Sequence, residues 1–481
     1  MKTQSFILPI LASCHLIAAV PTLQLVESNK LRRILTISNL KAQAAALMGI
    51  ATRNNGNREV GTPGDSESID WVYNQIPTDH YNVEIQNFTF PLYHSDDAFI
   101  VDGGNVAAFC YSEADITTPI TKTAELVLIT GNGCQASDFA GAAGKIGIMS
   151  AIRTSSCAGE PSSAFRDRVR TAGVLGLISL TNVEFPDGIL TPGPSSTLRS
   201  RQVVDPLVLC LLYQPRAQAI FDKLAPGSPP ISTTIRLHRW YEDVSTANII
   251  ATTKAGNQNS VILASASLDS YATSPGMNDN GSGTIALLEI AKAFTGFSTN
   301  NAVRFCWWGG SSPGLAGSRY YLSQLSAADK AKIVMNLNGY MLGSKNFIYG
   351  VTDGDGSAGV GSVLSNPASG IIEGAFNDFF NNEENKPSVP IPVGGASDHY
   401  AFFEEEIPAG GITTGSNGRK TPAQAGLFGG TAGEHYDTCY LKACDDVSNL
   451  NFRVFLTGTK AMAHVIAKYA RDITGFPFPR S

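Results

Sequence analysis

The stretch ASASLDSYATSPGMNDNGSGTIALLEIAKAF, residues 264–294, decides the fold of this chain. It follows directly from the apolar run Val261–Ala264 and passes through a polar, glycine-rich loop around Asp279. It ends in Thr284–Phe294, where apolar residues recur at helical spacing. A strand, a loop and a helix in this order form half of an α/β unit. In such folds, ligands bind at the loops that follow the carboxyl ends of parallel strands.

A second strand is predicted over Ala302–Trp308, which is apolar except for Arg304. It is followed by the loop GGSSP, residues 309–313. Because both loops follow predicted strands of one sheet, we expect them to open on a single crevice.

Length and charge narrow the function classes. A chain of 481 residues exceeds the usual size of a single core, so at least two domains are expected. Charged residues make up 16% of the chain, the net charge is -6 and the pI is about 5.7, which gives no basic surface for nucleic acid. We therefore expect peptides or proteins as partners.

The amino terminus, MKTQSFILPILASCHLIAAVPTLQ, has the pattern of a secretory signal peptide. Lys2 precedes an apolar run over 6–20 that is too short to span a membrane and ends near the small residues Ala18 and Ala19. A buried first helix is disfavoured because Pro9 would interrupt it. We predict that residues 1–19 are removed, that the product is secreted and that no membrane segment remains.

The motifs around the crevice resemble those of the secreted two-zinc aminopeptidases, the family of fungal aminopeptidase Y and the bacterial leucine aminopeptidases. The match rests on NDNGSG at 278–283, WWGG at 307–310 and CYLKAC at 439–444. The resemblance covers nearly the whole chain. It implies an α/β fold with a mixed, mostly parallel sheet flanked by helices.

Residues 105–232 differ in pattern from the rest, with short β-type runs between Gly- and Ser-rich loops. They resemble the β-rich protease-associated domain that is inserted in these peptidases. The predicted peptidase-like domain therefore has two parts, 20–104 and 233–481, on either side of the insert. No catalytic constellation occurs in the insert, so a structural or substrate-access role is favoured for it.

The resemblance also shows which metal ligands are missing. Relative to the family pattern, Asp279 matches the bridging aspartate, Asp269 matches the residue that orients a histidine ligand, and Tyr440 matches a tyrosine that stabilises the reaction intermediate. Four ligand positions and the general-base position are changed. Those of the ligands are occupied by Ser267, Ser312, Tyr340 and Leu441, and that of the base by Ser311.

A single carboxylate does not hold a pair of divalent ions, because tight sites require several deprotonated ligands in fixed geometry. The sequence therefore predicts a catalytically inactive relative without a cofactor, with a crevice available to peptides. One alternative is an active, zinc-dependent aminopeptidase with a metal site rebuilt from Asp279, Asp398, His399, Glu434 or His435. Another is a serine mechanism in which His399 or His435 activates Ser311 or Ser312.

Predicted disulfides and a glycosylation sequon are consistent with the predicted secretion. The resemblance implies disulfides Cys439–Cys444 and Cys134–Cys157, which suit an oxidising compartment. Cys110 and Cys210 remain unassigned, and Cys306, inside an apolar strand, is most simply a buried free thiol. The sequon at Asn87 predicts glycosylation in a secreted chain, whereas the sequon at Asn280 lies in the crevice loop.

Overall fold

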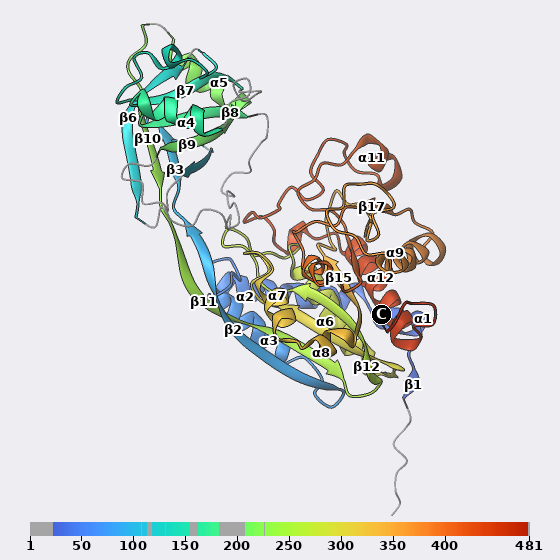
Figure 1. Ribbon diagram of the computed structural model, residues 1–481. Helices are drawn as coiled ribbons and strands as arrows, with labels where there is room; N and C mark the ends of the chain where they lie inside the picture. The colour runs from blue at the N-terminus through green and yellow to red at the C-terminus, as the bar shows by residue number, and fades with distance from the viewer. Residues whose placement is uncertain are drawn as a thin grey trace, which may run out of the picture. The chain divides into compact units, whose positions relative to one another are not determined.

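The computed structural model describes residues 23–106, 108–112, 118–129, 131–152, 162–181, 207–225 and 227–479. The chain forms two compact units (Figure 1): residues 1–88 with 245–481, and residues 89–244. Two long strands, β2 (Tyr81–Ser95) and β11 (Arg239–Thr253), are neighbours in a sheet and carry the chain from the first unit to the second and back. The predicted signal peptide 1–19 and Cys157 lie outside the described residues.

The first unit is built on a mixed eight-stranded sheet with the order β17-β16-β18-β15-β12-β14-β11-β2. Its central strands, β14 (Asn301–Trp308), β12 (Asn257–Ser267), β15 (Ile333–Tyr340) and β18 (Ala409–Thr413), pair in parallel. The register places Ser267 beside Trp308 and Tyr340 beside Thr413. The carboxyl ends of these strands therefore meet at one edge, as the sequence predicted for the first two.

Side chains of the central strands alternate between two buried faces. Val303, Phe305 and Trp307 of β14 pack into one core, and Cys306 and Trp308 pack into another. A strand covered on both faces is expected to be apolar throughout. This arrangement explains why the predicted strand at 302–308 lacks a polar face.

Helices cover both faces of this sheet. The larger core packs α2, α6, α9 and α12 against it, and the smaller core packs α7 and α10. The predicted helix Thr284–Phe294 is confirmed as α6, which begins three residues earlier. The remaining bounds in this unit are β1 Gln24–Leu25, α1 Ser28–Ile34, α2 Ile37–Arg53, α3 Pro63–Tyr73, α6 Gly281–Phe294, β13 Phe297–Ser298, α7 Ala316–Gln324, α8 Ala327–Ala331, β16 Gly350–Thr352, α9 Ser369–Asp378, η2 Phe379–Glu383, β17 Val389–Ile391, α10 His399–Glu404, α11 Pro422–Phe428, η3 Val447–Asn449 and α12 Phe452–Arg471.

The second unit contains its own eight-stranded sheet, with the order β4-β3-β10-β6-β7-β8-β9-β5. The predicted insert, 105–232, lies within this unit. A disulfide joins Cys110 of β5 to Cys210 of β9, two residues that face each other in the strand register. The bounds are β3 Ala98–Val101, β4 Gly104–Asn105, β5 Phe109–Ser112, β6 Ile120–Ile129, η1 Ala136–Phe139, β7 Ile146–Ile152, α4 Ser162–Thr171, β8 Gly176–Thr181, β9 Val208–Tyr213, α5 Gln214–Lys223 and β10 Ser232–Leu237.

Other cysteine predictions can be compared with the structure. The predicted Cys439–Cys444 bond is present, and Cys306 is a buried free thiol, as predicted. Cys134 is disulfide-bonded, and its pairing with Cys157 stays a prediction. Among the described residues, no single helix is long and apolar enough to cross a membrane, although the bent pair α1 and α2 passes on length and composition alone.

Candidate active site

A small pocket of about 130 Å³ lies where the carboxyl ends of the parallel strands meet. We call it the crevice pocket. It collects residues from the loops after β12 and β14, from the end of β15 and from the CYLKAC loop. Its lining is Ser267, Asp269, Tyr271, Asp279, Asn280, Ser311, Ser312, Gly314, Leu315, Tyr340, Gly395, Ala396, Ser397, Asp398 and Tyr440. The sequence predicted this crevice, and all of the family positions except Leu441, which is buried outside the lining, line it.

Asn280 ties the loops of the crevice pocket together. Its Nδ2 donates to Ser267 Oγ (3.0 Å) and to the Gly339 carbonyl oxygen (3.0 Å). Its Oδ1 accepts from the backbone N–H groups of Met341 (2.9 Å) and Gly283 (3.2 Å), the second bond capping α6. Both amide hydrogens are used and the residue is only 3% exposed, so the sequon at Asn280 has no free amide for a glycan. Asn87, in contrast, is exposed, and its glycosylation stays a prediction.

The close contact between α6 and β15 depends on Gly283. A Cβ at this position would lie 2.4 Å from the Gly339 carbonyl oxygen. Glycine therefore allows the amino terminus of α6 to approach the end of β15, which carries Tyr340.

Asp279, which stands at the predicted bridging position, lines the crevice pocket together with the phenols of Tyr340 and Tyr440. Burial, with the nearby Asp445 and Asp437, raises the pKa of Asp279 well above its usual value, and the Tyr340 hydroxyl opposes that shift. The carboxyl group therefore favours its neutral form as long as no positive charge lies beside it.

Asp269 holds the loop that follows β14. Its two carboxylate oxygens accept from the backbone N–H groups of Ser311 (2.9 Å) and Ser312 (3.0 Å). Burial raises the pKa of Asp269, and the hydrogen bonds from these serines oppose that shift. In place of an imidazole, Asp269 therefore orients the backbone at the positions where the family has its glutamates.

The carboxyl oxygens of Asp398 also accept hydrogen bonds, in this case from serine hydroxyls. Ser311 Oγ donates to Asp398 Oδ2 (2.8 Å), and Ser318 Oγ donates to Oδ1 (2.7 Å). Burial raises the pKa of Asp398 to about 7. Ser311 is thus bonded to a carboxyl group, and no imidazole of the described residues is hydrogen-bonded to it.

The remaining residues of the alternative metal site do not join the crevice pocket. His399 packs against Phe403, and both of its ring nitrogens are buried without a hydrogen-bond partner. Burial lowers its pKa to about 4. His435 Nδ1 bonds to the Asn417 carbonyl oxygen, and Glu434 is exposed. Within the described ranges, no three potential metal ligands converge at the crevice pocket.

Arg58 was not singled out from the sequence, yet it supports the first crevice loop. This fully buried guanidinium donates to the carbonyl oxygens of Leu268, Pro275 (3.2 Å) and Gly276 (3.0 Å). Burial lowers its pKa to about 10, and nearby carboxylates including Asp269 oppose that shift. Arg58 therefore places a positive charge behind the acidic lining.

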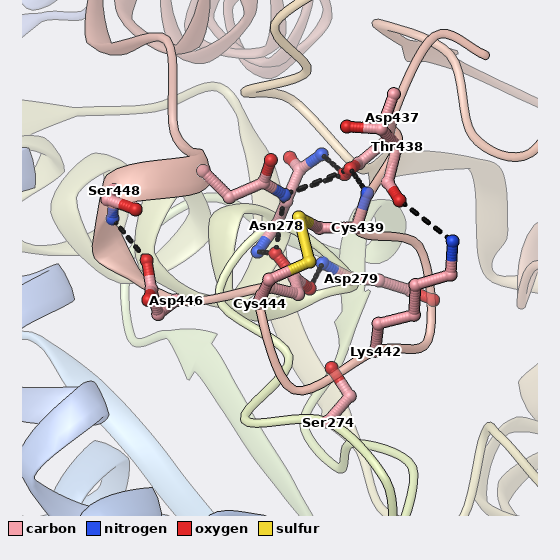
Figure 2. Close-up of a disulfide and its surroundings, with 12 residues drawn as sticks. Ser274, Asn278, Asp279, Asp437, Thr438, Cys439, Lys442, Cys444, Asp446 and Ser448 are labelled. Carbon is pink, nitrogen blue, oxygen red and sulfur yellow. Dashed lines mark hydrogen bonds between the residues drawn. A yellow bond between two sulfur atoms is a disulfide. The ribbon is translucent and has the colours of Figure 1, made fainter.

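A second unpredicted group lies behind the CYLKAC disulfide (Figure 2). Asp437 accepts from Asn278 Nδ2 (2.6 Å), and Asp445 accepts from the backbone N–H groups of Asn278 (2.9 Å) and Asp279 (3.1 Å). Asn449 Nδ2 donates to both aspartates. The sequence signal available for these two aspartates was their position on either side of CYLKAC. A loop closed by a disulfide holds the residues that flank it in place, so their carboxyl groups can accept from backbone N–H groups.

Comparison with known proteins identifies the family. Residues 248–468 match peptidase family M28. Leucine aminopeptidase 2 of Trichophyton rubrum is 37% identical over 426 residues, which cover 88% of this chain and 81% of that protein. This chain belongs to peptidase family M28. An aminopeptidase of Pseudomonas aeruginosa is 32% identical over 461 residues, or 90% of this chain and 81% of that protein.

Solved structures agree with the M28 fold. The aminopeptidase from Aneurinibacillus sp. strain AM-1 superposes with a TM-score of 0.63 at 19% identity, covering 92% of this chain and 96% of that one. The zinc aminopeptidase from Bacillus subtilis gives 0.60 at 20% identity, covering 93% and 96%. The predicted family and the mixed α/β fold are thereby confirmed, whereas the protease-associated domain predicted at 105–232 stays a prediction.

The residues of the crevice pocket do not fit two zinc ions. Zinc in proteins is bound by thiolate, imidazole or ionised carboxylate groups. Here the changed positions offer hydroxyl groups or an aliphatic side chain, and the pocket carboxyl groups of Asp269 and Asp398 already receive hydrogen bonds.

Proposed function

We propose that this chain is a catalytically inactive, secreted member of peptidase family M28 whose crevice pocket binds peptides. The observation that carries the proposal is the lining of the crevice pocket: Ser267, Ser312 and Tyr340 stand at predicted ligand positions, and among the described residues no three potential metal ligands converge there.

The loss of catalysis follows from the reaction. Two-metal peptidases use one pair of ions to polarise the carbonyl group and to supply a hydroxide, together with a base that takes the proton of the water. Ser311 stands at the base position, and its hydroxyl is held by Asp398 at 2.8 Å. A serine hydroxyl does not accept a proton at neutral pH, so the base position provides no acceptor for this step.

Two alternatives are less well supported. A rebuilt metal site needs His399, Glu434 or His435 beside Asp279, and none of these three lines the crevice pocket. A serine mechanism needs a histidine hydrogen-bonded to Ser311 or Ser312. The His399 nitrogens have no partner, and His435 Nδ1 is bonded to a backbone carbonyl group.

Peptide binding is supported by the charge of the pocket. Its lining has three carboxyl groups, three phenols and several hydroxyl groups, and no Lys, Arg or His. Such a lining favours a cation with hydrogen-bond donors, such as the ammonium group of a peptide. Secretion is supported by the disulfides Cys110–Cys210 and Cys439–Cys444, since such bonds persist in oxidising compartments.

Metal analysis and activity assays test the proposal together. We expect less than one zinc per purified chain and no hydrolysis of leucine- or arginine-amides, with an active M28 aminopeptidase as the positive control. Added zinc should not restore turnover. Stoichiometric zinc that a chelator removes together with activity would refute the proposal.

Peptide binding is tested separately by calorimetry with a short peptide and its N-acetylated form. The free amino group should be required for binding, and Asp279→Asn should weaken it, because a bound ammonium group favours the ionised form of Asp279 and an amide cannot ionise. Equal binding of both peptide forms would count against recognition of the ammonium group.

A further inference from the structure

Three acidic side chains meet away from the crevice pocket, between a loop and a helix of the first unit. Asp353 and Asp355 lie in the loop that follows β16, and Glu373 lies on α9. One carboxylate oxygen from each lies within 4.8 Å of the others. We call these three residues the loop–helix cluster.

The loop is packed tightly against the first turn of α9. A Cβ on Gly354 would lie 2.5 Å from Ser369 Cβ, and a Cβ on Gly370 would lie 2.3 Å from Asp355 Oδ2. Side chains at either position would force the loop away from the helix. The two glycines therefore allow the approach that brings Asp355 and Glu373 together.

Backbone N–H groups fix the direction of the two aspartates. Ala358 N–H donates to Asp353 Oδ1 (3.2 Å), and Ser357 N–H donates to Asp355 Oδ1 (2.9 Å). Ser362 Oγ donates to the Asp353 carbonyl oxygen (3.0 Å), and this bond holds the two ends of the loop 353–362 together. The carboxyl groups are therefore positioned before any ligand is present.

Two oxygens of the cluster lack donors. Asp353 is 0% exposed, and its Oδ2 is buried without a hydrogen-bond partner; Glu373 Oε2 is also buried and unpartnered. Within the described ranges, none of the three residues forms an ion pair with a basic side chain. Burial, Asp353 and Asp355 all raise the pKa of Glu373. An unpaired buried carboxylate oxygen is costly, so the arrangement calls for a positive partner.

We propose that Asp353, Asp355 and Glu373 bind a calcium ion that fastens the loop 353–362 to α9. The ligands are all oxygens, which suit hard cations, and the set contains no imidazole or thiolate to favour zinc. Calcium–oxygen distances of about 2.3–2.6 Å place ligands on opposite sides of the ion up to about 5 Å apart. The three carboxylate oxygens all lie within 4.8 Å of one another, so they fit around an ion of this size. Calcium is proposed in preference to magnesium because magnesium is usually held by only one or two carboxylates and demands near-ideal octahedral geometry.

Water completes the coordination on the open side. Asp355 and Glu373 are partly exposed, whereas Asp353 forms the buried end of the site. Calcium takes six to eight oxygens, and three carboxylates supply only part of this number. A partly hydrated site of this kind belongs with the weaker extracellular calcium sites, whose Kd is about 10⁻⁴–10⁻³ M.

The site does not depend on the proposed function, because it shares no residue with the crevice pocket. The competing explanation is a shared proton: Asp353 lies close enough to Asp355 for a hydrogen bond between their carboxyl groups. A proton shared in this way would make stability depend on pH and not on calcium.

Calorimetry with CaCl₂ on the EDTA-treated, dialysed full-length chain tests the proposal, with MgCl₂ in parallel. We expect one calcium per chain, weaker binding of magnesium, and a Tm that rises with calcium concentration. Asp353→Asn keeps Oδ1 for the Ala358 N–H and places an amide nitrogen where the ion would bind. This variant should stay folded, weaken calcium binding at least about 10-fold and lose the calcium-dependent rise in Tm.

Matched variants separate the site from general charge effects. Glu373→Gln should behave like Asp353→Asn, and it keeps the test valid if Asp353→Asn fails to fold. Glu405→Gln changes an exposed glutamate paired with Lys330 (2.6 Å), and calcium binding should be unaffected. The proposal is overturned if wild type shows neither heat nor a Tm change up to about 10 mM calcium. It is equally overturned if both cluster variants bind calcium as wild type does, or if magnesium binds more tightly.

Discussion

The crevice pocket and the loop–helix cluster each contain three carboxyl groups but provide opposite surroundings for them. In the crevice pocket, the oxygens of Asp269 and Asp398 accept from two backbone N–H groups and two serine hydroxyls. In the cluster, two buried oxygens have no donor. The number of acidic residues is therefore a poor guide to metal binding. What differs is whether the fold has already supplied hydrogen-bond donors to the oxygens.

The family resemblance alone would place the metal in the first region, and the donor pattern places it in the second. In the crevice pocket, the predicted substitutions are consistent with one another. Each changed ligand position carries a hydroxyl or aliphatic side chain, and such a side chain does not require a metal ion. Tyr340 is central to this change, since it stands at a predicted carboxylate position and places a phenol in the pocket beside Asp279.

The largest expected effect comes from converting the crevice pocket into a metal site. The variant Ser267→His, Ser311→Glu, Ser312→Glu, Tyr340→Asp and Leu441→His should bind zinc at least about 1000-fold more tightly than wild type, because each ion needs several ligands together. Zinc affinity measured by competition with a chromophoric chelator checks this. Activity should recover less than binding, since turnover also needs supporting contacts around the ligands.

Single restorations provide the control for that experiment. Ser267→His alone should leave zinc binding near the wild-type level. Tyr340→Asp alone should cost about 3–5 kcal/mol of unfolding free energy if the space of the ring stays empty. A folded five-residue variant that ignores zinc would show that the backbone of the crevice has also changed.

A smaller effect is expected from removing the charge behind the crevice pocket. Arg58→Met should lower the unfolding free energy by about 3–5 kcal/mol, because it leaves buried carbonyl oxygens and carboxylates without their cation. Urea unfolding measures the change. Arg53→Met is the matched control: Arg53 forms an exposed ion pair with Glu67, and its loss should cost about 0–1 kcal/mol. Equal effects of the two substitutions would contradict the role assigned to Arg58.

Stability should fall as pH rises from about 4 to 7 in part because of Asp398. Its pKa is about 7 in the folded chain, against a usual value near 3.8. The folded state therefore binds more protons than the unfolded state in this window, and stability declines by up to about 1.4 kcal/mol per pH unit from this group. The lowered pKa of His399, about 4, acts in the opposite direction below pH 6.5.

Asp398→Asn isolates this contribution. The amide keeps an acceptor for one serine hydroxyl and does not titrate, so the decline in urea midpoint between pH 4.5 and 7 should be shallower than in wild type. Asp329→Asn, at an exposed ion pair with Lys332, should leave the slope over this window unchanged. An unchanged slope in Asp398→Asn would mean that Asp398 is ionised throughout.

Much of this fold could be predicted from local patterns. The run 261–264, the glycine-rich loop and the segment 284–294 each carry a local signal, and the structure has β12, a loop and α6 there. The family positions could be assigned because they lie within short motifs. Local signals therefore located the crevice and predicted which ligand positions are changed.

The partners of those residues could not be predicted in the same way. Arg58 contacts Leu268 across 210 residues, and Cys110 bonds to Cys210 across 100. Such contacts depend on how whole helices and strands pack, and they leave no periodic pattern in the local sequence. The loop–helix cluster was missed for the same reason, because Glu373 joins Asp353 and Asp355 only when α9 packs beside β16.

The smallest predicted effect concerns the Tyr340 hydroxyl, which we expect to serve as a donor to Asp279. Tyr340→Phe keeps the ring but removes this hydroxyl, and should cost about 1–2 kcal/mol in urea unfolding, typical of a buried polar group left without its partner. Tyr440→Phe removes another hydroxyl of the pocket and should cost less, because Tyr340 then remains available to Asp279. If Tyr340 satisfies Asp279, the Phe variant should also bind divalent cations slightly better than wild type, since it frees one carboxylate oxygen. Yet the gain should remain far below that of the five-residue variant, because one freed carboxylate does not make a site. If Tyr340→Phe costs no more than Tyr440→Phe and zinc titration shows no change, Asp279 does not depend on Tyr340, and the contrast between the two regions would lose its physical basis.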